Sequence, residues 1–105
     1  MNVKIIKSTF GGVEYLAEPR VLRLGGVGMS GMDGITFVLP EEWKQLAVTL
    51  HLQREDGVML EPVLLDETGT AVPGQKATGT RSGLWMLLAM DGSGYRAMTK
   101  PEKYL

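Results

Sequence analysis

The hydrophobic positions of this chain fall in short runs that are separated by turn-forming residues. Glycine-containing turns recur about every eight to twelve residues, a spacing typical of antiparallel β-sandwiches and barrels. They are Gly11-Gly12, Gly25-Gly26, Asp33-Gly34, Asp56-Gly57, Thr68-Gly69, Pro73-Gly74, Ser82-Gly83 and Asp91-Gly92-Ser93-Gly94. Glycine suits tight hairpins because it adopts positive φ without steric cost. The pattern predicts an all-β, single-domain antiparallel β-sandwich or small barrel with short hairpins.

The runs between these turns have the composition of β-strands. They lie at 3–8, 13–17, 21–24, 35–39, 47–53, 58–65, 84–90 and 95–99. Residues 47–53 alternate clearly, because Val48, Leu50 and Leu52 share one face and polar residues occupy the other. Residues 84–90 are apolar on both faces, which indicates a central, doubly covered strand or a strand at an interface. Pro62 cannot donate a ladder hydrogen bond, so we expect its run at an edge or a bulge.

Helix is limited to at most one turn, near residues 40–45. Pro40 begins this turn and acidic residues follow it, both of which favour a helix start. Trp43 is expected to plug one end of the core. Two stretches have the composition of loops, the glycine-rich residues 25–34 and the polar residues 74–83. We expect residues 100–105 to form a loose C-terminal tail.

Length and charge exclude several classes of function. The 105 residues fit a single domain over 1–105, and 44% hydrophobic residues are enough for one core. The net charge of −1 and the scattered lysines and arginines argue against nucleic acid and anionic lipid as partners. There is no cysteine, which removes disulfides and thiol chemistry. The apolar runs are too short for a signal peptide or a membrane helix, so we expect a soluble protein made in the cytoplasm.

A glycine motif in the first loop has the letters of a dinucleotide-binding fingerprint. Residues 26–31 read Gly-Val-Gly-Met-Ser-Gly, which matches G-x-G-x-x-G. The mechanism needs a helix that opens at the third glycine, whereas the next segment, 35–39, has the composition of a strand. We therefore expect no cofactor. The loop is either simply flexible or becomes ordered on a partner.

The titratable residues do not form a recognisable catalytic or metal site. His51 is the only histidine and falls on the polar face of its strand, so a surface imidazole is the favoured interpretation. The loop carboxylates are Asp33, Asp56, Asp66, Glu67 and Asp91. Aspartate at turns bonds its own backbone, and this interpretation is favoured over calcium binding. We assign no catalytic, cofactor or metal residues, and a small enzyme built on His51 ranks last.

Contact surfaces are the remaining candidates. We expect Trp85 to be half-buried, on the face of its strand opposite Leu84, Met86 and Leu88. An exposed Trp85 or Tyr95 could stack on a sugar, so a small carbohydrate-binding β-sandwich module is the alternative function, against which a fully buried Trp85 would count. Methionines in the glycine-rich loop suit an adaptable contact or a cover over the core. The possible interface residues are Met29, Met32, Trp85, Leu87 and Tyr95.

Several segments together resemble a known group of proteins. They are Ile35-Thr36-Phe37-Val38-Leu39-Pro40-Glu41-Glu42-Trp43, Thr49-Leu50-His51, Gly83-Leu84-Trp85-Met86-Leu87-Leu88-Ala89-Met90-Asp91-Gly92 and Tyr95-Arg96-Ala97-Met98-Thr99. Over residues 35–99 the chain resembles small proteins encoded among the tail and baseplate genes of phages and prophages of Gram-positive bacteria. The resemblance implies a β-sandwich that docks into a tail or baseplate and carries no catalytic residues.

The expected function follows from this resemblance. It is that of a non-enzymatic structural or adaptor protein that acts through protein–protein assembly. Its partners would be further copies of itself, in a homo-oligomer, or other tail or baseplate subunits. Such a protein is made in the bacterial cytoplasm and ends in the virion tail.

Overall fold

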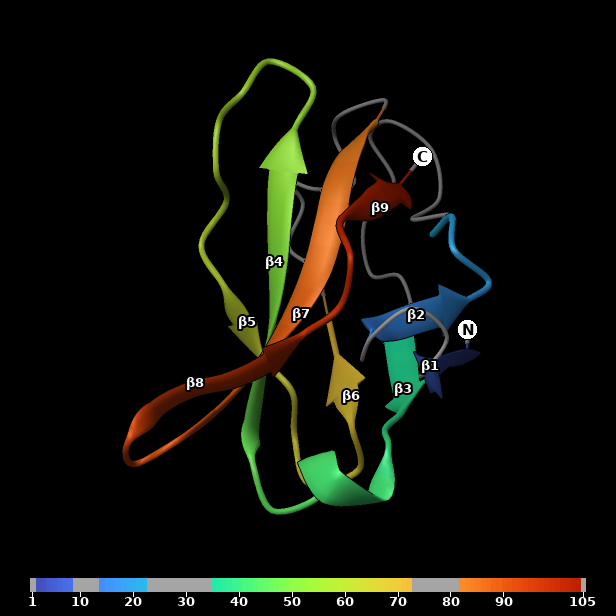
Figure 1. Cartoon of the computed structure of the whole chain (residues 1–105). Coiled ribbons are helices and arrows are strands. Elements are labelled where there is room, and N and C mark those ends of the chain that lie inside the picture. Colours follow the sequence, from blue (N-terminus) through green and yellow to red (C-terminus); the bar gives the residue numbers. More distant parts are fainter. Residues whose placement is uncertain (1, 9–13, 23–34, 73–81, 105) are drawn as a thin grey trace.

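Nine short strands and one 3-10 turn make up the part of the chain that the computed structural model describes, residues 2–8, 14–22, 35–72 and 82–104. In chain order they are β1 (Asn2–Ser8), β2 (Glu14–Glu18), β3 (Ile35–Val38), η1 (Glu41–Trp43), β4 (Ala47–Arg54), β5 (Val63–Leu64), β6 (Thr70–Ala71), β7 (Gly83–Asp91), β8 (Gly94–Met98) and β9 (Glu102–Tyr104). The prediction of an all-β domain with one helical turn near 40–45 is confirmed (Figure 1).

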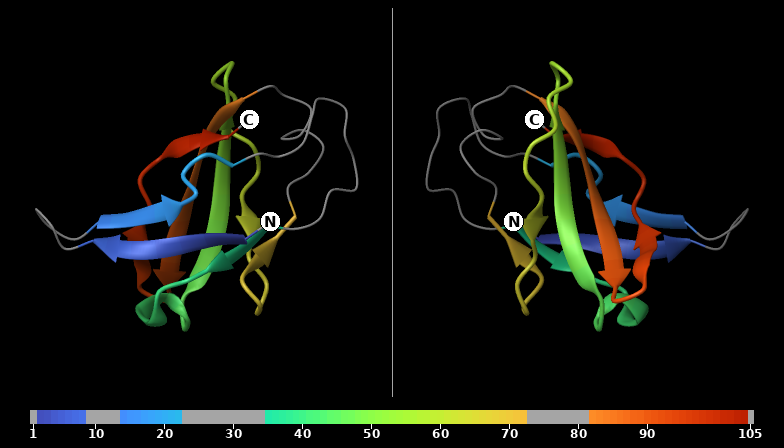
Figure 2. Two further views of the ribbon diagram at one scale, coloured as in Figure 1. Left: turned by 90° about the vertical axis from the view of Figure 1, so that its right-hand side faces the viewer. Right: turned by 90° about the vertical axis from the view of Figure 1, so that its left-hand side faces the viewer.

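The strands form two sheets that pack against each other. Sheet A has the strand order β2-β1-β3-β6, and sheet B has the order β5-β4-β7-β8, with β9 also paired with β7. All strand pairs are antiparallel except β1 with β3. Figure 2 shows the long strands of the two sheets crossing at a steep angle, as in orthogonally packed sandwiches. The predicted sandwich or small barrel is therefore observed.

Backbone contacts connect the two sheets along one side, which gives the sandwich a barrel-like character. A bridge joins Tyr15 of β2 to Thr99, directly after β8, and another joins Leu22 to Tyr104 of β9. The Leu22 N–H donates to the Lys103 carbonyl at 3.1 Å. At the opposite side, the turn at residues 66–69 carries the chain from β5 in sheet B to β6 in sheet A. These connections reduce the number of exposed strand edges.

The core lies between the two sheets and is built from alternate residues of each strand. In β4 the inward residues are Val48, Leu50 and Leu52, as the alternation predicted. Trp43 of η1 is almost fully buried and its ring lies 4.8 Å from that of Tyr15, measured between centroids. The turn that carries Trp43 lies at one end of the sandwich (Figure 1). The expectation that Trp43 plugs one end of the core is confirmed.

Two expectations about the ends of the sheets have different outcomes. The Pro62 run does lie at an edge, because β5 is the outermost strand of sheet B and only Val63–Leu64 of the run is regular strand. The expected loose tail over 100–105 is wrong, since Glu102–Tyr104 forms β9 on the edge of β7. The reason is Tyr104, whose buried ring occupies the space over Gly83 that a side chain there would fill. A short terminal segment can be fixed by one such aromatic residue.

Candidate functional site

The outer face of sheet B, the face turned away from sheet A, is the first candidate for a functional surface. Its residues alternate with the core residues of the same strands. We define the outer face by Ala47, Thr49, His51 and Gln53 of β4, Leu84, Met86, Leu88 and Met90 of β7, Leu64 of β5 and Met98 of β8. Register places Leu64, Thr49, Leu88 and Met98 in one row across the four strands.

The β7 part of this face is apolar where an ordinary outer sheet face is polar. Antiparallel sheets with one solvated face usually place charged or polar side chains on it. The outward positions of β4 and β7 carry no Asp, Glu, Lys or Arg, and all four of β7 are leucine or methionine. Leu64, Leu84 and Met98 are clearly exposed, with Leu64 at 63%. Contiguous apolar surface of this kind marks interaction sites.

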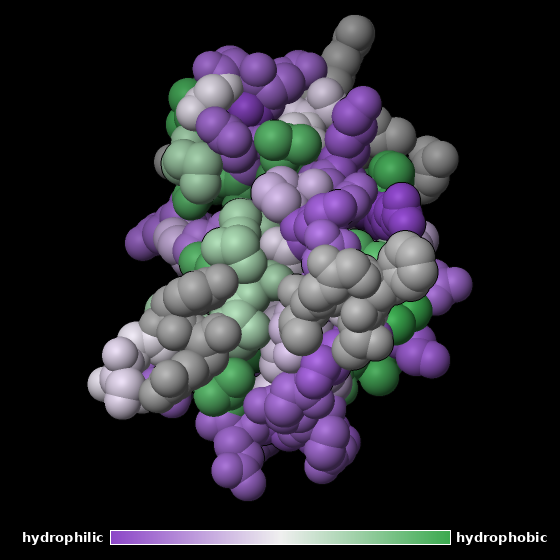
Figure 3. All heavy atoms as spheres, in the orientation of Figure 1, coloured by the Kyte–Doolittle hydropathy of each residue, from purple (hydrophilic) through white to green (hydrophobic). Residues whose placement is uncertain are grey.

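The space-filling view shows how the apolar surface is bordered. Green apolar atoms form a vertical band left of the centre of the view, on the side where sheet B lies. Hydrophilic side chains gather above and below this band (Figure 3). An apolar centre with a polar rim is the usual anatomy of a protein–protein interface. Three methionines, Met86, Met90 and Met98, contribute flexible side chains that adapt to a partner surface.

His51 is the only titratable residue among the outward positions of β4 and β7. Its Nε2 lies 2.8 Å from the Thr49 hydroxyl, two residues earlier on the same face. Partial burial lowers the pKa of His51 below its ordinary value of 6.5, because desolvation disfavours the charged ring. The imidazole is therefore neutral at neutral pH, and the outer face then carries no charge on these two strands. The expected surface histidine is half-buried.

Two of the expected interface residues belong to the core instead. Trp85 and Leu87 point inward from β7 and are 1% and 0% exposed. The Trp85 indole N–H donates to the Arg20 carbonyl at 3.0 Å, and its ring lies 5.7 Å from that of Phe37. The expectation of a half-buried Trp85 is wrong, and its ring offers no face for a sugar. Period-2 alternation separates the two faces of β7, but both are apolar, so the sequence does not say which one is inside.

The other expected interface residues cannot be placed. Met29, Met32 and the side chain of Tyr95 lie outside the described part of the structure. Of the outward residues of β7, Leu84, Met86 and Leu88 were identified in the sequence only as the face opposite Trp85, and Met90 completes this face in the structure. The alternation of the strand separates the outward set from the inward set, but only the packing of sheet B on sheet A shows which set faces outward.

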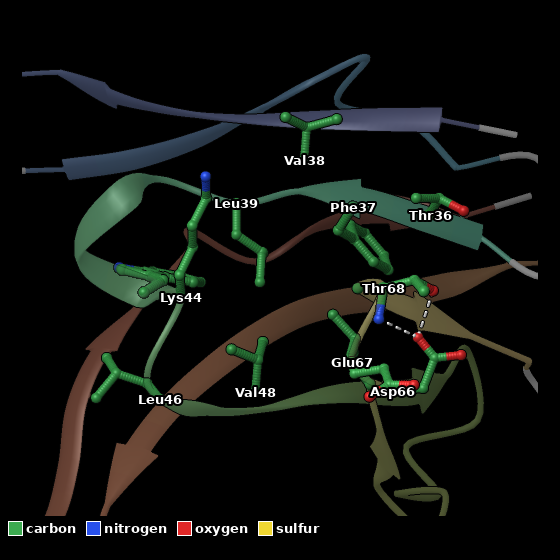
Figure 4. Close-up of a pocket in the computed structure, with 13 residues that line it drawn as sticks. Thr36, Phe37, Val38, Leu39, Lys44, Leu46, Val48, Asp66, Glu67 and Thr68 are labelled. Atoms are coloured by element: carbon green, nitrogen blue, oxygen red, sulfur yellow. Dashed lines mark hydrogen bonds between the residues drawn. The ribbon is translucent and has the colours of Figure 1, made fainter.

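A second candidate is a groove of about 570 Å3 at one end of the sandwich. We call it the sheet-end groove, and its lining residues are Thr36, Phe37, Val38, Leu39, Trp43, Lys44, Leu46, Val48, Leu65, Asp66, Glu67, Thr68 and Gly69. Figure 4 shows Leu39, Lys44 and Leu46 along one side and Asp66 to Thr68 along the other, with Phe37 and Val48 between them. The groove thus combines an apolar floor with charged rims.

The acidic wall of the sheet-end groove is a tightly bonded turn. Asp66 Oδ1 accepts hydrogen bonds from the Thr68 N–H at 2.8 Å, the Thr68 hydroxyl at 2.6 Å and the Thr70 N–H at 3.0 Å. The Thr68 hydroxyl bond, followed by the backbone bond of Thr70, lowers the pKa of Asp66, so the carboxylate stays ionised. Asp56 and Asp91 cap their own turns in the same way, through Val58 and Ser93. For these three aspartates the predicted turn role is confirmed, whereas Asp33 lies outside the described residues.

Neither candidate has the arrangement of a catalytic or metal site. Within residues 2–8, 14–22, 35–72 and 82–104, no three His, Asp or Glu side chains come together in a way that could hold a metal ion. His51 contacts Thr49 and lies on an open sheet face rather than in a pocket with an acid. In the same part of the chain, no helix has the length and apolar character needed to cross a membrane.

Known proteins do not place the chain in a family. Comparison with models of protein families, with curated proteins and with solved structures gave no match to this sequence or fold. The functional argument therefore rests on the two surfaces described above, the outer face of sheet B and the sheet-end groove.

Proposed function

We propose that this chain is a non-enzymatic structural or adaptor protein that acts by protein–protein assembly through the outer face of sheet B. The observation that carries the proposal is that the outward positions of β4 and β7 carry no acidic side chain, lysine or arginine, and that those of β7 are all leucine or methionine, on a sheet face that sheet A does not cover. Lys103 of β9, which pairs with Leu84, lies at the border of this face. Burying such a face removes apolar surface from water, the main driving force of association. The resemblance of residues 35–99 to tail and baseplate proteins supports assembly in a phage or prophage tail.

The partner that this face suits best is a second copy of the chain. A flat apolar face can stack on its own copy about a two-fold axis, so that the same residues meet from both sides. The central strand β7 would then lie near the axis, with Leu88 among the most buried residues. In a tail or baseplate such pairs would be building blocks that other subunits extend.

Solution mass tests the assembly proposal directly. Size-exclusion chromatography with light scattering, over a range of concentrations, is expected to show a stable oligomer. Leu84→Lys and Met98→Lys each place a charge on the outer face and should shift the protein towards monomer. Val58→Lys is the matched control, because Val58 is exposed to a similar extent at the β4–β5 hairpin, outside the outer face. A monomer at all concentrations would contradict self-assembly.

The phage part of the proposal has its own test. Antibodies against the chain should detect it in tail particles purified after prophage induction of the producing strain. Its absence from particles that contain the other tail proteins would contradict a structural role in the virion. Binding of purified glycans at low concentration would instead favour the carbohydrate-binding alternative, on a surface other than Trp85.

A further inference from the structure

We propose that the sheet-end groove is a second binding site, which takes a segment of a partner protein that presents an apolar side chain next to a lysine or arginine. This site is separate from the outer face of sheet B. None of the residues that define the outer face, on β4, β5, β7 and β8, lines the groove. The proposal therefore does not depend on self-assembly, and it adds a site for a different kind of contact.

The floor of the groove is apolar and becomes partly exposed towards the rim. Phe37, Val48 and Leu65 come from the core, and the half-buried Leu39 and Leu46 extend the apolar surface to the rim. A volume of about 570 Å3 lies within the usual range for binding pockets, about 300–1,000 Å3. An apolar side chain that enters the groove would cover surface that water now reaches, which favours binding.

The charges at the two rims are not equally available. On one rim the Lys44 ammonium lies 2.9 Å from the Glu41 carboxylate, so its charge is already paired. On the opposite rim Asp66 and Glu67 make no ion pair with any of the described residues. Asp66 is held ionised by its turn, and Glu67 is exposed. The groove therefore presents unpaired negative charge beside an apolar floor, which is complementary to a cation beside an apolar side chain.

The acidic wall is preformed, which lowers the cost of binding. The Phe37 N–H donates to the Gly69 carbonyl at 2.8 Å, and this bond fixes the turn against β3. Within the turn, the Gly69 N–H donates to the Asp66 carbonyl at 2.9 Å and the Asp66 N–H donates to the Thr70 carbonyl at 2.9 Å. Gly69 has φ +80° and a side chain there would meet the Phe37 carbonyl. A partner would find the Asp66 carboxylate already in place, which lowers the entropic cost of binding.

The chemistry favours a protein segment over a small ligand. Exposed apolar and charged residues both border the groove: Val38 is 53% exposed, and Lys44 and Glu67, on opposite rims, are also exposed. A chain that passes over this rim can place one side chain on the floor and the next residue against the carboxylates. Such alternate use of side chains is how extended segments are recognised at sheet ends and edges.

The test uses the full chain and three acetylated, amidated peptides. The first has the sequence Gly-Ser-Lys-Leu-Lys-Ser-Gly, the second has both lysines replaced by glutamate, and the third has the leucine replaced by asparagine. Amide NMR spectra of the protein are recorded during titration with each peptide. We expect saturable shifts centred on Phe37, Thr68 and Gly69 with the first peptide, and binding at least about fivefold weaker with the other two.

Charge variants of the protein check the direction of the effect. Glu67→Lys should weaken binding of the first peptide by about fivefold, because it replaces attraction by repulsion at an exposed position. Glu61→Lys makes the same change of charge at an exposed residue outside the groove and should have no effect. Lys44→Gln removes the opposing cation and leaves Glu41 unpaired, so binding should become tighter.

Several outcomes would overturn the proposal, whereas peptide binding that survives the loss of the oligomer would support it. Equal binding of the glutamate peptide, or equal effects of Glu67→Lys and Glu61→Lys, would remove the role assigned to the acidic wall. No saturable binding of any peptide, or shifts away from the groove, would remove the site. Amide shifts at the groove that change with protein concentration, in the absence of peptide, would mean that a second copy of the chain occupies the groove. Loss of the oligomer in Leu84→Lys with peptide binding retained would show that the two sites are independent.

Discussion

The two faces of β7 are both apolar, but they lie in opposite environments. Inward, Trp85, Leu87 and Ala89 are 1% exposed or less. Outward, Leu84 and its alternate neighbours Met86, Leu88 and Met90 range from half-buried to exposed. Sheet A covers the first set, whereas no described residue of sheet A covers the second. A strand that is apolar on both faces indicates that both faces need shielding from water. Among the described residues, sheet A shields only the inner face of β7.

Adjacent leucines allow the sharpest test of this comparison. Leu87→Ala removes a fully buried side chain and should lower the free energy of unfolding by about 2–5 kcal/mol, the range for such core truncations. Leu88→Ala, one residue along, removes the same atoms from the outer face and should cost less than about 1 kcal/mol in the monomer. Urea denaturation at low protein concentration measures both.

The concentration dependence of the same pair separates fold from assembly. If the outer face binds a second copy, the unfolding midpoint of the unaltered chain should rise with protein concentration, and Leu88→Ala should reduce that rise. Leu87→Ala should lower the midpoint equally at all concentrations. Equal losses for the two variants at low concentration would show that the two faces of β7 are equivalent in the fold, contrary to the structure.

Gly83 is the first residue of β7 and lies where β9 packs against that strand. A Cβ at this position would clash with the Gln53 carbonyl and the Tyr104 ring, and the strand backbone leaves little room for adjustment. Gly83→Ala should therefore lower the free energy of unfolding by about 1–3 kcal/mol, as overpacking does. Gly92→Ala, where nothing lies within 4 Å of the new Cβ, is the control. An unchanged stability in thermal unfolding would mean that β9 does not hold this position.

Thr99 is the buried polar residue of the same region. Its hydroxyl oxygen accepts the Leu87 N–H at 2.9 Å, while the Thr99 N–H donates to the Leu87 carbonyl at 3.0 Å. Thr99→Val keeps the shape but leaves a buried donor without a partner, at a cost of about 1–2 kcal/mol. Thr99→Ser retains the hydroxyl and should lose less. A Thr99→Val variant as stable as the parent would show that the Leu87 N–H finds another acceptor.

The sequence predicts the fold of this chain better than its surfaces, for a physical reason. Alternation in 47–53 and glycine turns are local signals, and they correctly indicate β4 and the hairpin at Asp56-Gly57. The two-residue strand β6 and the terminal β9 have no such signal, because pairing with β3 and β7 over large sequence separations creates them. Tyr104 shows this best, since its burial depends on a glycine that lies 21 positions earlier in the sequence.

The candidate sites were less accessible to prediction for the same reason. The sheet-end groove combines residues 36–48 with residues 65–69, which only the packing of the two sheets brings together. Asp66 was identified as a turn residue, which is correct, but its place beside an apolar floor is a tertiary fact. Trp85 was expected to be half-buried and was named as a possible interface residue, because both faces of its strand are apolar and no local signal shows which one is inside.

The smallest expected effect concerns His51, the titratable residue of the outer face on β4. Burial lowers its pKa in the folded chain below the ordinary 6.5, so the unfolded chain binds the proton more tightly. The stability contributed by the neutral ring is therefore present above the unfolded pKa and is lost as the pH falls through the folded pKa.

NMR titration of the ring protons should give a pKa below 6.5 in the monomer and a still lower pKa in an assembled state, because a partner on this face would bury the ring further. His51→Gln should weaken the pH dependence of stability between about pH 7.5 and pH 5.5. A His51 pKa that is the same at low and high protein concentration, in a protein that does form oligomers, would place the oligomer contact elsewhere than on the outer face.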